Sequence, residues 1–307
     1  MRIVVSGGTG VIGRAAVPAL RAEGHDVAVL SDSPLEGPDG AEPADAETVV
    51  GDPLDVDSLV RAYAGADAVI SLAGRMPSGF EAVRPKAWRR HDLLRTVGVG
   101  NVVAAAREAG VRRIVQESGS FLYADNGDDW INEDHRLEIT RATEPLAVAE
   151  THVQGYTCGS RAGVILRFGW LVGDEPLTRR QLRGATRGRP VGLGAPERWI
   201  HLLHTDDIGS AVVAALVAPS GVYNVGAEPV RRHEVVSAYA AAAGVGSLGS
   251  AGPVLRRLAA TRLEPMTRSL RVCSEHFCAH TGWTPSRPRF EVSWLDSALE
   301  AVAEGVQ

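Results

Sequence analysis

Three glycines between a predicted strand and a predicted helix, at the start of the chain, constrain the fold more than any other feature. Residues 2–6 are mostly apolar and β-branched, which is typical of a buried parallel strand. Gly7, Gly10 and Gly13 follow, and residues 11–20 then form an apolar helical segment. A strand that turns through glycines into a helix presents unpaired N–H groups at the positive end of the helix dipole. The pattern therefore predicts a pyrophosphate-binding turn, in which the glycines permit the tight turn, the approach of a phosphate and the packing of helix on strand.

Composition excludes several other classes of protein. The chain has 307 residues, enough for one large α/β domain or two coupled ones. Its net charge of −5 gives no reason to expect a nucleic-acid partner. It has no basic-plus-apolar leader and no apolar run long enough to span a membrane, so we expect a cytoplasmic protein without a membrane partner. Cys158, Cys273 and Cys278 lack metal-ligand spacing, so we expect free thiols and no metal site.

An acidic residue follows the second predicted strand, residues 27–30. Asp32 stands about twenty residues after the glycines, where the ribose hydroxyls of an adenosine are held in dinucleotide-binding folds. A carboxylate there repels a 2′-phosphate, so Asp32 predicts NAD as the cofactor. Arg14 is the competing feature, because an arginine just past Gly13 can reach a 2′-phosphate, and NADP is therefore not excluded. A solvated turn aspartate is the alternative reading of Asp32.

The same alternation of strands and helices continues along the chain, and with it a resemblance to a known family. The chain resembles the extended short-chain dehydrogenase/reductase superfamily, of the NAD-dependent epimerase/dehydratase type, in its glycine turn, in Asp52-Pro53 and in Leu72-Ala73-Gly74. Later motifs follow in the family's order at His201–Asp207, Tyr223-Asn224 and Trp283-Thr284-Pro285. The resemblance implies an α/β fold with a Rossmann-like, doubly wound parallel sheet in residues 1–170 and 200–226. It also implies a smaller C-terminal substrate-binding cap in residues 171–199 and 227–307.

The resemblance assigns the cofactor-binding residues. Asp52 would accept from the adenine amino group, the small residues Ala73 and Gly74 would let the backbone lie against the ribose, and the loop from Gly169 would pass the nicotinamide. Arg95 departs from the family, which has an asparagine at this position. The predicted cofactor-binding residues are Gly7, Thr9, Gly10, Val11, Ile12, Gly13, Asp32, Asp52, Pro53, Leu72, Ala73, Gly74, Arg95, Gly169, Trp170 and Leu171.

The residue types that carry the family's chemistry are missing at the corresponding positions of this chain. The family uses a Ser or Thr after the 113–117 strand and a Tyr-x-x-x-Lys on the next helix, whose lysine lowers the phenol pKa. Counting back from Tyr123 puts the Ser/Thr position on Gly119. Counting from Glu150 puts the Tyr and Lys positions on Ala142 and Leu146. Lys86 is the only lysine and none of the five tyrosines precedes it by four, so the ordinary mechanism is excluded.

Other residues are then candidates for the chemistry. We predict Ser118, Ser120 and Tyr123 as catalytic substitutes, with a packed aromatic as the alternative for Tyr123. His91 and Arg95 lie one turn apart on the predicted helix 88–110 and can face the same pocket. The remaining candidates are an acidic loop with Glu133, Asp134 and His135, and an arginine cluster suited to an anionic substrate such as a nucleotide diphosphate, either of which can equally be a solvated surface. The cluster comprises Arg179, Arg180, Arg183, Arg187 and Arg189.

Three functions remain open from the sequence. The first is an oxidoreductase, epimerase or dehydratase that acts on a small molecule with non-standard acid–base residues. The second is a cofactor-retaining isomerase, lyase or cyclase without net redox chemistry. The third is a regulatory protein that senses a dinucleotide. Substrate identity and oligomeric state stay open, with a homodimer among the assemblies that the sequence allows.

Overall fold

A seven-stranded parallel sheet forms the centre of the molecule, which is described by a computed structural model over residues 1–32, 46–72, 74, 84–249 and 262–305. The strand order is β11-β7-β5-β4-β1-β2-β3, and every neighbouring pair is parallel. The strands are β1 (Arg2–Ser6), β2 (Asp26–Ser31), β3 (Glu47–Val50), β4 (Ala68–Ser71), β5 (Arg113–Gly119), β7 (Ala162–Phe168) and β11 (Gly221–Val225).

The apolar run at the start of the chain occupies the middle of this sheet. In β1 the side chains of Ile3, Val4 and Val5 are fully buried, because helices cover both faces of the strand. The chain order of the strands reverses between β1 and β4, which are neighbours in the sheet. In doubly wound sheets ligands bind outside the carboxyl ends of the strands at such a reversal. The fold therefore places the glycine turn, directly after Ser6, at the edge of that crevice.

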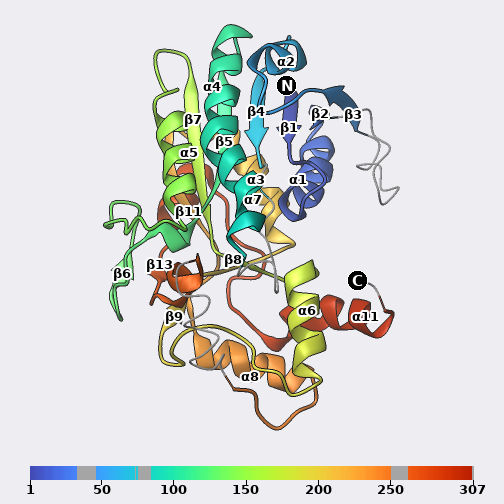
Figure 1. Cartoon of the computed structure of the whole chain (residues 1–307), viewed down its shortest axis with the longest axis vertical. Coiled ribbons are helices and arrows are strands. Elements are labelled where there is room, and N and C mark those ends of the chain that lie inside the picture. Colours follow the sequence, from blue (N-terminus) through green and yellow to red (C-terminus); the bar gives the residue numbers. More distant parts are fainter. Residues whose placement is uncertain (33–45, 73, 75–83, 250–261, 306–307) are drawn as a thin grey trace.

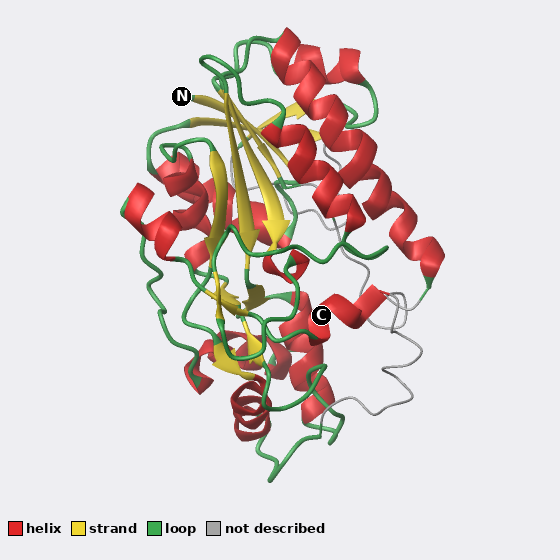
Figure 2. Cartoon of the chain, turned by 90° about the vertical axis from the view of Figure 1, so that its left-hand side faces the viewer, coloured by secondary structure: helices red, strands yellow, loops and turns green. Residues whose placement is uncertain are grey.

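Helical layers lie on the two faces of the sheet, as the edge-on view of Figure 2 shows. Helices α1 and α7 pack together on one face, while α2, α4 and α5 pack on the other. Their bounds are α1 (Val11–Ala22), α2 (Val56–Ala62), α3 (Arg89–Leu93), α4 (Val99–Glu108), α5 (Glu144–Gln154) and α7 (Asp207–Ala215).

The predicted helix over 88–110 is interrupted in the structure. A 3-10 turn, η2 (Pro85–Trp88), leads into α3, and a π-helical turn, η3 (Leu94–Gly98), separates α3 from α4. π-Helical turns inside helices are rare and frequently occur at functional sites. This one carries Arg95, whose side chain is buried.

A second, smaller region contains α6, α8 and α11, which lie together below the seven-stranded sheet in Figure 1. Its core is a separate apolar cluster that includes Leu182, Tyr239, Trp294 and Leu295. The helices are α6 (Pro176–Ala185), α8 (Arg232–Ala242), α10 (Glu275–Thr281) and α11 (Asp296–Ala303), with the 3-10 turns η4 (Ser120–Leu122), η5 (Glu264–Thr267) and η6 (Val292–Leu295). Three two-stranded sheets complete it, formed by β6 (Trp130–Ile131), β8 (Trp170–Val172), β9 (Trp199–Ile200), β10 (Leu202–His204), β12 (Val230–Arg231) and β13 (Arg271–Val272).

The predicted fold class is confirmed, and the strands end within a few residues of where the sequence places them. One segment of the C-terminal region packs elsewhere than on the cap: Phe277 of α10 and Trp283 lie in the apolar cluster beneath β11 and α7. The predicted loop over 34–47 falls mostly outside the described residues. Among the described helices, none is long and apolar enough to cross a membrane.

Candidate functional site

The glycine turn has the geometry of a phosphate cradle. Gly7 has a φ of 83°, in the left-handed region, and its carbonyl accepts the Gly10 N–H at 3.0 Å. A Cβ on Gly13 would lie 2.5 Å from Cα of Gly8, so this glycine is what lets α1 lie against the end of β1. A Cβ on Gly10 would meet only the Gly7 carbonyl oxygen, at 3.3 Å, so the missing side chain leaves free space. No described side chain caps α1 at Gly10, and its first N–H groups face that space, which fits a pyrophosphate.

The predicted adenosine side of the site is exposed. Asp32 lies just past β2, and its carboxylate forms an ion pair with Arg90 at 3.2 Å. Arg14 donates from Nε to the Thr9 carbonyl at 2.9 Å, so its guanidinium lies against the glycine turn. Asp52 accepts from the Leu54 N–H at 2.8 Å, beside the end of β3.

The side chain of Arg95 lies beside Gly74, just after β4. Its contacts there were not predicted from the sequence. Its guanidinium pairs with the Glu117 carboxylate and donates from Nη1 to the Glu117 carbonyl at 2.9 Å. A Cβ on Gly74 would lie 2.6 Å from Arg95 Nε, so Gly74 makes room for this side chain. Burial raises the pKa of the Glu117 carboxyl, against the opposing effect of Arg95. Leu72 is buried beside them, and Ala73 lies outside the described residues.

The loop predicted to pass the nicotinamide is fixed by close backbone packing. A Cβ on Gly169 would lie 2.8 Å from the carbonyl carbon of Leu202, so β8 and β10 approach each other closely there. Trp170 and Leu171 follow in β8 and are half-buried.

The Phe121 ring packs against Gly119, the position that the sequence analysis predicts for the family's catalytic hydroxyl. A Cβ on Gly119 would lie 2.7 Å from Cζ of Phe121, so the ring fills the space that a side chain at position 119 would need. Ser118 is buried and donates to Glu150 at 2.5 Å. Ser120 is also buried. Of the two flanking serines, Ser118 is thus committed to a carboxylate of the core.

The positions counted for the family's Tyr and Lys meet in one pocket. Ala142 and Leu146 both line it, with Phe121 on the same wall. Helix α5 begins only at Glu144, with Pro145 in its first turn, so Ala142 precedes the helix that the resemblance expects it to occupy. The full lining is Trp88, His91, Phe121, Ala142, Thr143, Leu146, Arg262, Pro265 and Met266. Two apolar side chains, together with the ring that covers Gly119, thus line the pocket at the positions that the sequence analysis predicts for the family's proton-transfer groups.

His91 is the titratable side chain at the centre of this lining. It is 3% exposed and stacks edge-on against Trp88, with ring centroids 5.4 Å apart. Burial, together with the charge of Arg95, lowers the pKa of His91 to about 4. The residue is therefore neutral at pH 7.

Tyr123 belongs to a buried polar network and not to the pocket lining. Its hydroxyl donates to Asn224 Oδ1 at 2.7 Å and accepts from Arg167 Nη1 at 2.8 Å. Arg167 in turn binds Glu150 through two hydrogen bonds, at 2.6 and 2.9 Å. Burial raises the pKa of Tyr123 to about 12. The hydroxyl of Tyr123 is thus buried with two hydrogen bonds inside the core, and its predicted catalytic role stays a prediction.

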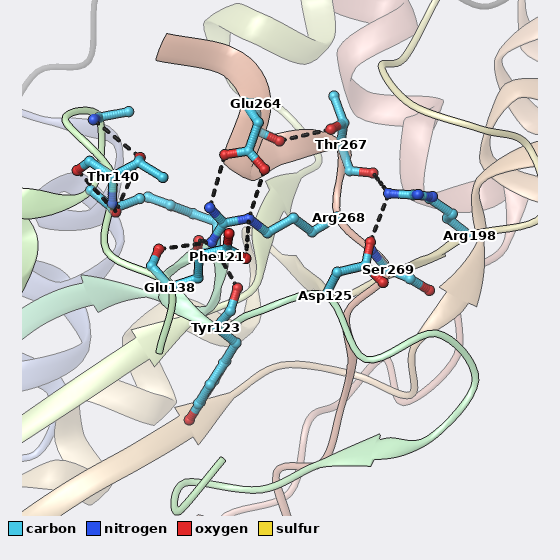
Figure 3. A network of polar contacts seen from close by, with 12 residues as sticks. Phe121, Tyr123, Asp125, Glu138, Thr140, Arg198, Glu264, Thr267, Arg268 and Ser269 are labelled. Carbon is cyan, nitrogen blue, oxygen red and sulfur yellow. Dashed lines mark hydrogen bonds and ion pairs between the residues drawn. The ribbon is translucent and has the colours of Figure 1, made fainter. Parts of the chain in front are cut away.

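Arg268 is buried and connects η5 to the segment after β5 (Figure 3). Arg268 forms an ion pair with Glu264 of η5 and donates from Nη1 to the carbonyls of Tyr123 and Glu138, at 2.9 and 3.0 Å. These contacts tie η5, which carries Pro265 and Met266, to the segment after β5. The pocket is thereby closed by residues that are more than a hundred positions apart in the sequence.

The other predicted candidates lie outside the pocket lining. Glu133 accepts the Asn224 N–H at 2.7 Å, which is a structural bond to β11. Asp134 is exposed, and His135 is half-buried with its Nε2 unpartnered among the described residues. In the arginine cluster, Arg179 forms an ion pair with Asp174 at 2.6 Å, and α6 belongs to the cap.

Most of the pocket lining was missed by the sequence reasoning. Phe121 stands two residues from Gly119, and an aromatic beside a missing hydroxyl was the one available signal. Arg262, Pro265 and Met266 carry no motif, and only tertiary packing brings them to the pocket.

Comparison with known proteins identifies the family of this chain. A model of NAD(P)H-binding proteins matches residues 7–219, from the glycine turn to the end of α7 and beyond. The chain belongs to this NAD(P)H-binding family. Within it, the chain is a member of the extended short-chain dehydrogenase/reductase superfamily, as the sequence predicts, and is an enzyme of the NAD(P)-dependent reductase and epimerase type.

One relative matches this chain over almost its whole length. The 3-diazoavenalumate denitrifying reductase of a Streptomyces species is 31% identical over 316 residues, which cover 96% of this chain and 98% of the relative. Two solved structures share the fold at lower identity. MoeE5 in complex with UDP-glucose and NAD has a TM-score of 0.78 at 22% identity and covers 100% of both chains. A human epimerase family protein with NADPH has a TM-score of 0.79 at 21% identity and covers 99% of both.

A pair of glycine substitutions separates binding from folding. We expect Gly10→Val to abolish NAD(P) binding with little change in the melting temperature, because its Cβ enters only the space of the phosphate. Gly13→Val should lower the free energy of unfolding by about 1–3 kcal/mol or more, because its side chain meets backbone. Calorimetric titration and thermal unfolding of both variants test this. An unchanged affinity of Gly10→Val for NAD(P) would show that the glycine turn does not bind the cofactor.

Proposed function

We propose that this enzyme reduces a diazonium compound with NAD(P)H and releases its nitrogen as N2. The observation that carries the proposal is the pocket itself, which Ala142, Leu146 and the Phe121 ring line at the positions that counting along the sequence assigns to the family's proton-transfer groups. The full-length likeness to a denitrifying reductase of a diazo compound supports the same substrate class.

The chemistry of the acceptor explains why such a pocket suffices. A bound reduced nicotinamide supplies a hydride. A carbonyl that gains a hydride becomes an alkoxide, which needs a positioned acid, and general acid catalysis is typically worth 10²–10⁴-fold. A diazonium cation that gains a hydride at its terminal nitrogen becomes a neutral diazene, R–N=NH, which loses N2 to give R–H. The balance is R–N2⁺ + H⁻ → R–H + N2, so no proton from the protein is consumed.

The residues of the chain have simpler tasks in this scheme. The glycine turn and the N-terminus of α1 hold the pyrophosphate. Trp88 and Phe121 line the pocket with aromatic rings, and Arg262 lies over the Trp88 ring at 5.1 Å from its centroid. Ala142, Leu146 and Met266 keep water from the reacting atoms, and water would otherwise compete for a diazonium carbon.

The proposal predicts a preference between two substrates that share a ring. We expect the enzyme to consume NAD(P)H with benzenediazonium at least about 100-fold faster than with benzaldehyde, since only the aldehyde requires an acid. Absorbance of the reduced nicotinamide and released N2 measure the rate, and one N2 should appear for each NAD(P)H oxidised. The Gly10→Val variant supplies the rate of the reaction outside the site.

A second variant tests whether another residue supplies the proton. Tyr123→Phe should keep the diazonium rate within about twofold per folded molecule, because its hydroxyl does not reach the pocket. Rapid reduction of benzaldehyde, or a loss of about tenfold or more in Tyr123→Phe, would contradict the proposal.

We also propose NAD as the preferred cofactor. The proposal rests on the exposed Asp32 carboxylate just past β2, which would repel a 2′-phosphate; Arg90 pairs with Asp32, and Arg14 lies against the glycine turn. We expect NAD to bind more tightly than NADP, and Asp32→Asn to narrow the difference by removing the negative charge. Arg90→Ala should widen it, because Arg90 neutralises Asp32. Competitive titration of the two nucleotides measures all three proteins, and an NADP preference in the unaltered enzyme would show that the arginines outweigh Asp32.

A further inference from the structure

Two histidines lie side by side on the exposed face of α10, away from the cofactor site. His276 and His280 are both exposed, and their ring centroids are 4.3 Å apart with 50° between the ring planes. Residues four apart in a helix project from the same face, and two histidines at this spacing can bind one metal ion. The expectation of no metal site rests on the three cysteines and does not concern this pair.

The hydrogen bonding of His280 suits a metal ligand. Its Nδ1 lies 2.8 Å from the backbone carbonyl oxygen of His276. Because a carbonyl oxygen only accepts, Nδ1 donates the ring proton and Nε2 keeps its lone pair. Histidines that bind metals almost always donate their other ring N–H to a carbonyl, a carboxylate or water, which fixes the tautomer and the ring orientation. His280 therefore already has the hydrogen bond that a metal-binding imidazole needs.

The ring of Tyr223, from β11, orients both imidazoles. Tyr223 is buried, and its hydroxyl donates to the Pro219 carbonyl at 3.0 Å. The His276 ring stacks on it with centroids 5.0 Å apart and 23° between the planes, and the His280 ring lies 6.0 Å from it. Side chains that are held in place before a ligand arrives lose less conformational freedom on binding. The two histidines are thus preorganised by one fixed aromatic ring.

The separation of the two rings matches that of imidazoles on one ion. Two imidazole nitrogens bound at about 2.1 Å and at a right angle bring the ring centroids to roughly 4.5 Å apart, close to the observed 4.3 Å. Imidazole is a ligand of zinc, copper and nickel ions. We propose that His276 and His280 bind one divalent ion of this kind. No third His, Cys, Asp or Glu side chain among the described residues completes the site, so water fills the other ligand positions.

Such an ion stabilises α10, and with it the edge of the sheet. The helix has seven residues, and Phe277, which follows His276, is buried in the apolar cluster beneath β11 and α7. An ion held by two side chains one turn apart restrains the helix between them. Because it binds the folded chain, it raises the free energy of unfolding by mass action. This role is separate from the proposed reductase activity and does not depend on it.

Titration with Ni²⁺ tests the site in the full chain without a polyhistidine tag. We expect calorimetry to show saturable binding of one ion and thermal unfolding to show a higher melting temperature with Ni²⁺. His276→Gln and His280→Gln should each weaken binding by at least about tenfold, because losing only a hydrogen-bond partner of a ligand already costs about that much. Both side chains are exposed, so the variants should keep the circular dichroism of the unaltered enzyme.

His233→Gln is the matched control. His233 is also exposed, and its Nδ1 lies 3.0 Å from the Pro196 carbonyl oxygen, but it stands on α8, outside the pair. Its Ni²⁺ affinity should equal that of the unaltered enzyme. The absence of saturable binding, binding that survives in either His276→Gln or His280→Gln, or an equal loss in His233→Gln would overturn the proposal.

Discussion

The close approach of α1 to the end of β1 is the contact on which the rest of the molecule depends. It exists because Gly13 has no side chain to meet Gly7 and Gly8. The helix so placed packs against α7, and the turn before it opens at the reversal between β1 and β4. The cofactor site follows from this one contact, since an N-terminus of α1 further from the sheet would not face the crevice.

The pocket lined by Phe121, Ala142 and Leu146 depends on other residues than the glycine turn does. Counting along the sequence puts the family's three proton-transfer positions on Gly119, Ala142 and Leu146, and the structure brings Ala142, Leu146 and the ring that covers Gly119 into one pocket lining. A single loss would leave a damaged dehydrogenase site. We propose that the three apolar positions, with Phe121 packed over Gly119, form a pocket for an acceptor that needs no acid. Tyr123 and Ser118 instead support the core, through Arg167 and Glu150.

Local pattern was enough for the sheet and the glycine turn, because strand periodicity and glycine spacing are properties of neighbouring residues. Counting along the chain also located Ala142 and Leu146 in the pocket. It could not show that Tyr123 lies in the core, where Arg167 and Asn224 pair with its hydroxyl, because these partners are distant in the sequence. Arg262 and Met266 could not be found from the sequence, since Arg268 and Glu264 bring their segment to the pocket only in the folded chain.

The central claim is that reduction in this pocket requires no proton from the protein. A single-turnover experiment with benzenediazonium in H2O and in D2O tests it most directly, because it isolates the chemical step. The account predicts a rate ratio of about 1 between the two solvents, with a clear slowing when the transferred hydrogen of the nicotinamide is deuterium. A solvent ratio of about 2 or more, with uptake of one proton for each turnover, would contradict it.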